Sequence, residues 1–277
     1  MKIINHLLHD ANEKPYSFRA TPNMGKEDLK AKYLVMHYTA GPHAEQAVNW
    51  LTNPRAKASA HLVIGRDGNI TQLVPFNKVA WHAGRSYWHG ISGLNDYAIG
   101  IELDNAGVLS RSIEGQWVAW FGDVIASEQV LEAVHKNETS PRGWQLYTPE
   151  QLYVALEVAS ELIEYYRLRD IIGHDDIAPT RKTDPGPAFP LENFRGRLFG
   201  RAESGPDETV YRTTVTLNIR SGPGTQHEPL AAGPLPENTR LHILIDEGTW
   251  KKVNVLNEIR GVNGLQGWVH HRYITPI

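Results

Sequence analysis

Residues 171–189 constrain this chain more than any other stretch. They read as the end of a short apolar strand, then a polar loop that holds His174, Lys182 and Asp184, then a turn rich in proline and glycine. Ordering so polar a loop costs conformational entropy and buries little apolar surface in return, so we expect it to position functional groups. A second apolar strand, residues 33–38, runs into His37 and a Gly-Pro turn. Two histidines and a carboxylate are a ligand set suited to a hydrolytic zinc site.

Five spaced segments agree with one family. They are His37 at the end of its strand, residues 60–68, 80–84 and 99–103, and the loop 174–186. In this order they resemble the zinc-dependent N-acetylmuramoyl-L-alanine amidases, which include phage lysozyme-type amidases, anhydro-muropeptide amidases and peptidoglycan recognition proteins. The resemblance covers roughly residues 30–195. It implies a hydrolase that cuts the amide between the lactyl group of N-acetylmuramic acid and L-alanine, with zinc (Zn2+) as cofactor and peptidoglycan or a muropeptide as substrate.

The resemblance also implies roles for single residues. His37, His174 and Asp184 would hold the metal, although Asp175 and Asp176 are nearer to His174 and compete as the carboxylate. Glu102 would be the general base, and Lys182 would stabilise the oxyanion. The plainer alternatives are an exposed strand glutamate and a solvated loop lysine. Some relatives carry a tyrosine where this chain has Ala60, which strengthens the prediction for Glu102.

Four further residues are expected to bind substrate: His61, Trp81, His82 and Asn95. For His61, burial with hydrogen bonds to the backbone is an equal alternative. Two other functions also remain open at this point. One is a peptidoglycan recognition module that binds without cutting, and the other is a zinc peptidase that cuts within the stem peptide.

Composition excludes several function classes. A net charge of -3 gives no electrostatic basis for binding nucleic acid. The absence of cysteine excludes disulfides and thiolate chemistry. No stretch approaches the roughly 20 apolar residues that span a bilayer, and residues 1–10 lack the apolar core of a secretory signal. We therefore expect action on the cell wall after release by a non-classical route, as in an endolysin, with a cytoplasmic recycling enzyme as the alternative. The oligomeric state is left open.

The pattern of apolar residues predicts an α/β fold with a mixed central β-sheet flanked by helices. Strands are expected at 31–38, 59–64, 70–74, 97–104 and 169–173, and helices at 44–51 and from Thr148 to about Arg167. In the second helix, residues 152, 156, 159, 163 and 166 should face the core. Residues 1–30 are expected to form an irregular arm. Residues 105–148 are expected to be the least regular part, and a loop of that length in a compact domain is usually functional.

The last third of the chain follows a different pattern. Residues 201–208 are polar and are predicted to be a linker that separates an amidase domain, 1–200, from a second domain, 209–277. There, short strands alternate with Gly, Pro and Asn turns, which favours a small all-β barrel. Residues 217–224 and 267–274 resemble the bacterial SH3-like domains of cell-wall hydrolases. Such a domain would anchor the enzyme to the wall or serve as a stabilising appendage.

Overall fold

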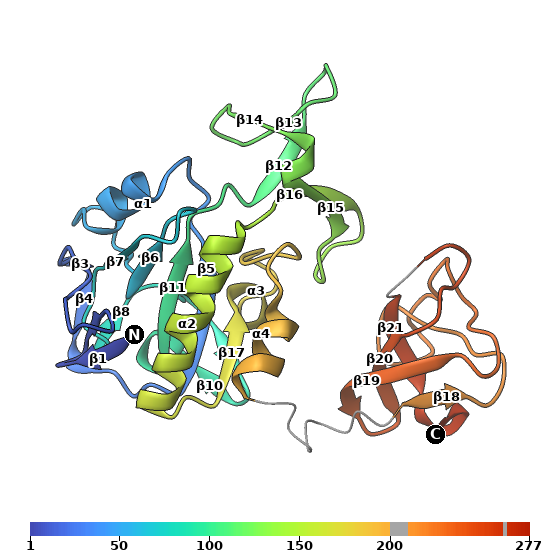
Figure 1. Cartoon of the computed structure of the whole chain (residues 1–277). Coiled ribbons are helices and arrows are strands. Elements are labelled where there is room, and N and C mark those ends of the chain that lie inside the picture. The colour runs from blue at the N-terminus through green and yellow to red at the C-terminus, as the bar shows by residue number, and fades with distance from the viewer. Residues whose placement is uncertain (200–209, 263–264) are drawn as a thin grey trace. The chain divides into compact units, whose positions relative to one another are not determined.

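The computed structural model describes residues 1–199, 210–262 and 265–277 (Figure 1). The chain divides into two compact units, Met1–Gly200 and Arg201–Ile277. The predicted linker at 201–208 lies outside the described residues. Each unit is described here by itself.

A six-stranded mixed sheet forms the centre of the first unit. Its order is β17-β5-β11-β6-β7-β3, with bounds β17 (Asp170–Gly173), β5 (Tyr33–Tyr38), β11 (Ala98–Leu103), β6 (Leu62–Ile64), β7 (Ile70–Gln72) and β3 (Ser17–Phe18). The first four of these strands are mutually parallel, β7 runs antiparallel to β6, and β3 is parallel to β7. The predicted mixed α/β sheet is therefore confirmed.

Both faces of this sheet are buried, as a parallel sheet requires. On one face, residues such as Leu34, Met36 and Ile101 form the main core with α2 (Pro149–Tyr166) and α4 (Leu191–Leu198). Figure 1 shows α2 running across this face. On the other face, Val63 packs with α1 (Ala44–Leu51). Because side chains alternate along a strand, His37 and Glu102 lie on the α1 face, opposite α2.

Helix α2 begins as the sequence predicts. The Thr148 hydroxyl accepts a hydrogen bond from the Gln151 backbone N–H, and Pro149 occupies the first turn. The buried face differs by about one residue from the predicted one: it consists of Gln151, Ala155, Val158, Ala159 and Leu162. The expected residues Leu152, Leu156, Ile163 and Tyr166 are only partly buried and flank this stripe. Small Ala and polar Gln residues thus face the sheet where the pattern predicted large aliphatic ones.

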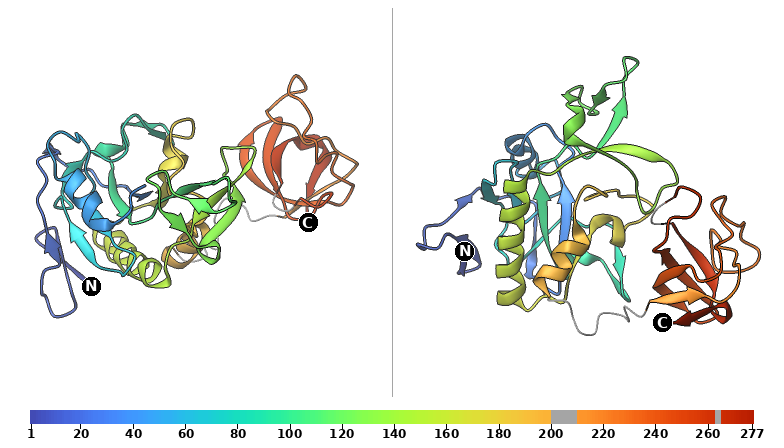
Figure 2. Two further views of the ribbon diagram at one scale, coloured as in Figure 1. Left: turned by 90° about the horizontal axis from the view of Figure 1, so that it is seen from above. Right: turned by 45° about the vertical axis from the view of Figure 1, so that its right-hand side comes forward.

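The segment expected to be irregular is a sheet instead. It contains β12 (Val108–Arg111), β13 (Trp117–Val118), β14 (Val124–Ile125), β15 (Val130–Val134) and β16 (Pro141–Gln145). These strands form a five-stranded antiparallel sheet in the order β14-β13-β12-β16-β15, which projects from the central sheet (Figures 1 and 2). We call residues 105–147 the insertion. The prediction of irregular structure was wrong because strands of two to five residues are too short to show alternation.

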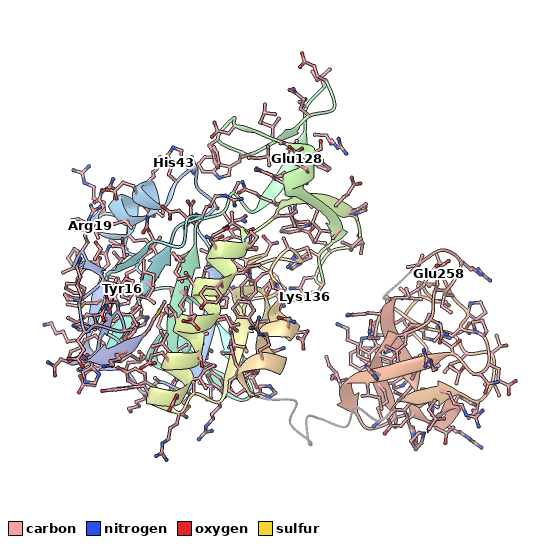
Figure 3. The ribbon with its side chains drawn as sticks, viewed as in Figure 1. Tyr16, Arg19, His43, Glu128, Lys136 and Glu258 are labelled. Atoms are coloured by element: carbon pink, nitrogen blue, oxygen red, sulfur yellow. The ribbon has the colours of Figure 1, made fainter. Side chains whose placement is uncertain are left out.

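The N-terminal arm is also more regular than predicted. It contains β1 (Lys2–Ile4), β2 (Leu7–His9) and β4 (Met24–Asp28), and β4 pairs with β8 (Lys78–Ala80). Arg19, labelled in Figure 3, donates to Glu45 at 2.6 Å and to Asn49 at 2.7 Å on α1. The remaining short elements are β9 (Tyr87–Trp88), β10 (Ile91–Ser92) and α3 (His174–Ile177).

The second unit is an antiparallel, barrel-like sheet. Its order is β21-β20-β19-β18-β22, with bounds β18 (Tyr211–Thr213), β19 (Arg240–Glu247), β20 (Trp250–Val255), β21 (Gln266–His270) and β22 (Ile274–Pro276). It has its own core, which consists of Leu217, Ile219, Leu235, Leu241, Val253, Val255, Ile259 and Val269. In neither unit does the described part contain a helix with the length and apolarity needed to cross a bilayer.

Candidate metal centre and active site

Three neighbouring parallel strands deliver polar groups to one edge of the central sheet. Glu102 on β11 lies directly opposite His37 on β5. On the other side of β5, Gly173 lies opposite Met36, so His174 follows at the level of His37. The carboxyl ends of parallel strands meet at the same edge, where α/β proteins commonly place their sites. Residues far apart in the sequence therefore come together.

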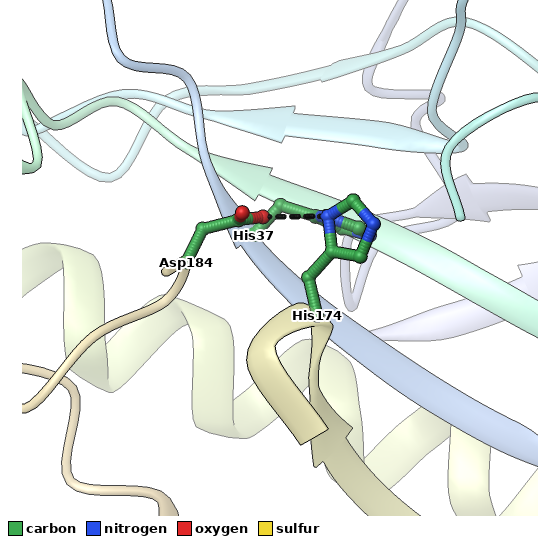
Figure 4. Close-up of side chains that lie close together, drawn as sticks. All are labelled: His37, His174 and Asp184. Atoms are coloured by element: carbon green, nitrogen blue, oxygen red, sulfur yellow. Dashed lines mark hydrogen bonds and ion pairs between the residues drawn. The ribbon is translucent and has the colours of Figure 1, made fainter. Parts of the chain in front are cut away.

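His37, His174 and Asp184 form a compact, buried triangle of ligand atoms (Figure 4). The Nδ1 atoms of the two histidines are 2.9 Å apart, and Asp184 Oδ2 lies 2.9 Å from each of them. All three side chains are less than one tenth exposed. The structure thus brings together the three predicted ligands.

Hydrogen bonds to the far side of each ring assign the histidine tautomers. His174 Nε2 lies 3.1 Å from the Ala83 carbonyl oxygen and donates to it. His82 Nε2 donates to the Ala98 carbonyl at 3.0 Å, so His82 Nδ1 must accept from His37 Nε2 at 2.9 Å. Both Nδ1 atoms in the triangle are then unprotonated. Such outer contacts orient metal-binding imidazoles in known sites.

The electrostatics of the triangle favour an unprotonated set. Burial lowers the pKa of His37 to about 4, and the neighbouring His174 adds to this effect. With the tautomers given above, two Nδ1 lone pairs and the Asp184 carboxylate converge on one point.

This donor set fits a divalent cation. Without a cation, three acceptor atoms at 2.9 Å would repel one another. Zinc bonds to imidazole nitrogen at about 2.0–2.1 Å, which in tetrahedral geometry separates ligand atoms by about 3.3 Å, close to the spacing here. Three protein ligands also leave a fourth position for water or substrate, as catalytic zinc sites do. His37, His174 and Asp184 can therefore hold a metal.

Glu102 lies beside the triangle, in surroundings that disfavour its charged form. Burial and the negative charge of Asp184 raise its pKa well above the ordinary value, and Lys182 only partly opposes this. Its Oε2 atom is buried and has no hydrogen-bond partner among the described residues. A carboxyl group that binds its proton this tightly is suited to general acid–base chemistry.

Lys182 and Arg181 diverge from the same loop. Both line the pocket that contains the triangle. The Arg181 guanidinium donates to the carbonyls of Ala83 at 2.8 Å and Arg85 at 3.0 Å, so it bonds to the turn after Trp81. The positive charge of Lys182 acts instead on Glu102 and His37.

Several hydrogen bonds fix the loop that carries Asp184. The Tyr38 hydroxyl lies 2.7 Å from Thr183 Oγ1, and the Tyr147 hydroxyl donates to the Pro185 carbonyl at 2.8 Å. The Asp175 backbone N–H donates to the Asp184 carbonyl at 2.8 Å and so joins the two ligand-bearing segments. None of these contacts was predicted from the sequence, because a tyrosine in a strand gives no sign of its partner.

The two carboxylates that compete with Asp184, those of Asp175 and Asp176, have other partners. Asp175 Oδ2 pairs with His135 Nε2 at 2.9 Å, and its Oδ1 pairs with Lys136 at 2.7 Å. Asp176 accepts from the Gly173 backbone N–H at 2.7 Å and from Lys136 at 2.6 Å. Both side chains therefore bond to residues outside the triangle.

The predicted substrate-binding residues separate into two groups. Trp81 and His82 line the pocket. His61 is fully buried: its Nε2 bonds to the Lys78 carbonyl and its Nδ1 accepts from the Gly100 N–H. Asn95 Oδ1 accepts from the backbone N–H groups of His82 and Ala83. His61 therefore matches the structural alternative, and Asn95 shapes the turn that carries His82 instead of lining the pocket.

His82 also has a positioning role that the sequence did not reveal. Its ring packs against Gly100 on β11, where an added Cβ would lie 2.4 Å from the ring. Glycine at this position makes room for the imidazole that holds His37. The remaining pocket wall contains Trp50, Trp120 and Phe121, which were not predicted as site residues. The pocket encloses about 780 Å³.

Comparison with known proteins agrees with this arrangement. A family model described as N-acetylmuramoyl-L-alanine amidase matches residues 27–187, more than half of the chain. The chain belongs to this amidase family. The matched range includes all three residues of the triangle together with Glu102 and Lys182.

The chain is similar in sequence to several bacterial amidases. The chain is 37% identical over 188 residues to 1,6-anhydro-N-acetylmuramyl-L-alanine amidase AmpD of Escherichia coli K12, a match to 61% of this chain and 83% of AmpD. It is 31% identical over 180 residues to N-acetylmuramoyl-L-alanine amidase AmiD of the same strain, a match to 62% of this chain and 54% of AmiD. A solved complex of E. coli AmiD with anhydro-N-acetylmuramic acid-L-Ala-D-gamma-Glu-L-Lys aligns with a TM-score of 0.45 at 30% identity, over 63% of this chain and 57% of that one.

Proposed function

We propose that this chain is a zinc-dependent N-acetylmuramoyl-L-alanine amidase that hydrolyses the amide between the lactyl group of N-acetylmuramic acid and L-alanine in peptidoglycan or muropeptides. The observation that carries the proposal is the triangle of His37, His174 and Asp184 beside Glu102, in a chain of the amidase family. The names of AmpD and AmiD, both amidases of this bond, support the choice of substrate.

The residues of the pocket divide the chemistry among them. When bound by the triangle, zinc would supply Lewis acidity toward the amide carbonyl and an adjacent water. Glu102, with its raised pKa, takes a proton from the attacking water and returns it to the departing amine of L-alanine. Lys182 stabilises the oxyanion that forms as the carbonyl is attacked. The exposed Trp81 offers a flat wall to the substrate.

The experiment that tests this proposal follows the bond that is cut. Purified wild-type protein with zinc is incubated with peptidoglycan sacculi, and the products are analysed by mass spectrometry beside Glu102→Gln. Cleavage at the lactyl–alanine bond yields peptide-free glycan and stem peptides that begin with L-alanine. Fragments cut inside the stem would instead indicate a zinc peptidase, and binding without products would indicate a recognition module.

We further propose that residues 209–277 form an SH3-like domain that acts on the cell wall together with the amidase domain, 1–200. The barrel-like antiparallel sheet and the resemblance of residues 217–224 and 267–274 support this assignment. A domain that binds the wall would place the enzyme outside the cytoplasm, as in an endolysin.

A further inference from the structure

Three tryptophans line the pocket at the metal triangle, and two of them are far more exposed than a folding role requires. Trp50 on α1 is 56% exposed and Trp120 in the β13–β14 turn is 76% exposed. Trp81 is 37% exposed, and Phe121 completes the wall. Exposed aromatic surface that adjoins an active-site pocket marks a binding site more often than a packing defect.

Trp120 is held in place by a hydrogen bond and by a neighbouring ring. Its Nε1–H donates to the Ala40 carbonyl at 2.6 Å, which pins the indole to the loop just beyond His37. Phe121 meets the indole edge-on, with ring centroids 5.7 Å apart and planes at 82°. An indole that is fixed in this way loses little rotational freedom when a ligand stacks on its face.

The cations and two of the tryptophans of the pocket come from different elements. The cations Arg181 and Lys182 come from the loop that carries Asp184, whereas Trp50 and Trp120 come from α1 and the insertion. Stem peptides carry carboxylates, which cations attract, whereas the C–H faces of a pyranose ring suit a flat aromatic surface. Trp50 and Trp120 therefore fit the glycan, and the cations fit the peptide.

We propose that Trp50 and Trp120 form a saccharide subsite that binds a pyranose ring adjoining the muramic acid whose amide is cut. This inference rests on the proposed amidase function and extends it, because it gives the enzyme a preference for glycan strands over single-sugar muropeptides. The insertion supplies half of the subsite through Trp120.

The test compares kcat/KM for two substrates that share the scissile amide. One is N-acetylmuramoyl tripeptide, and the other is a tetrasaccharide glycan fragment with the same stem. We expect Trp120→Ala and Trp50→Ala each to reduce the preference for the tetrasaccharide about tenfold, which corresponds to about 1.4 kcal/mol. Trp120→Phe, which keeps a ring but loses the N–H, should retain most of the preference.

Ile113→Ala is the matched control, because Ile113 lies in the insertion, is fully exposed and does not belong to the pocket. Thermal melting of each variant checks that the fold is intact. Equal substrate preference in Trp120→Ala, Trp50→Ala and Ile113→Ala would overturn the subsite while leaving the amidase function standing. Loss of preference in Trp120→Phe to the level of Trp120→Ala would also overturn the subsite, because the retained ring face should still stack on the sugar. A wild-type protein that cuts neither substrate would instead refute the amidase function.

Discussion

Asp184 contacts both histidines of the triangle through a single oxygen, Oδ2. Its negative charge would stabilise a cation bound by the triangle. We expect Asp184→Asn to weaken zinc binding by more than about 100-fold, the upper end of what the loss of an outer contact costs. Metal content after dialysis against a weak chelator measures this effect. Asp123→Asn is the control, since Asp123 is exposed and lies outside the triangle, and it should keep its zinc; retention of full zinc by Asp184→Asn would contradict the ligand assignment.

Glu102 combines its proposed catalytic role with a cost in stability. Its pKa is raised in the folded protein, mainly by burial and then by Asp184. Between the unfolded pKa of 4.5 and the folded value, the native state keeps a proton that the unfolded state has lost, so stability falls as pH rises through that window. Replacement by glutamine removes this penalty.

Glu102→Gln should therefore lower amidase activity by about 10²–10⁴-fold, the usual contribution of general acid–base catalysis. In metal-free protein, the same variant should be more stable than wild type at pH 8 and should lose this advantage near pH 4.5. Urea unfolding midpoints at the two pH values measure the difference. Glu128→Gln, at an exposed position labelled in Figure 3, should show no such pH-dependent gain. An equal gain in both variants would contradict the role of burial.

At this scale, the sequence led to the residues of the triangle because each stands beside a recognisable strand or turn. The residues alone left Asp175 and Asp176 as competitors, and the resemblance to the amidase family favoured Asp184. The bonds of Asp175 and Asp176 to His135 and Lys136, from a remote segment, could not be predicted. The positioning role of His82 depends on the absence of a side chain at Gly100 on β11. Such relationships arise only when the chain is folded.

At the scale of elements, the insertion bonds directly to the segment that follows His174. At the end of β15, His135 and Lys136 bond to Asp175, the residue next to His174. The Asn137 amide donates to the Asp175 carbonyl oxygen at 3.0 Å. The His135 ring stacks on Trp144 of β16 with centroids 5.4 Å apart. The insertion thus supports the segment between two ligands.

Lys136→Met should consequently weaken zinc binding by about 10–100-fold, because the loop that orients His174 loses its anchor. Competition with a fluorescent chelator gives the affinity, and activity should recover at saturating zinc. Arg142→Met is the matched control in the same insertion, since it removes only a surface pair with Glu138. If the two variants bind zinc equally well, the insertion does not support the loop.

Helix α2 and the strands of the central sheet other than β3 could be predicted from the sequence, because these strands lie in runs of apolar residues and the helix shows a long apolar period. The insertion could not, since the buried apolar residues of its small core cluster, Ala106, Leu109, Trp117 and Ala119, are few and widely spaced. Its pairing relies on contacts between short strands, which leave little pattern in any one segment.

For the molecule as a whole, the two units have separate cores and are expected to have separable roles. If the C-terminal unit binds the wall, a protein that ends at residue 199 should cut a soluble muropeptide at the wild-type rate. On intact sacculi it should lose about tenfold or more, because the second contact no longer raises the local concentration. Release of soluble amino groups from each substrate measures both rates. Equal activity on both substrates would favour the stabilising appendage.

His37 and His174 are separated by 137 positions in the chain, yet one ion would join them. Such a metal-mediated cross-link would close a very long loop reversibly. It can form only after β5 and β17 lie side by side. Zinc supply would therefore govern how long the protein resists unfolding and proteolysis as well as how fast it works. A pulse of chelator should shorten its lifetime in the presence of a protease.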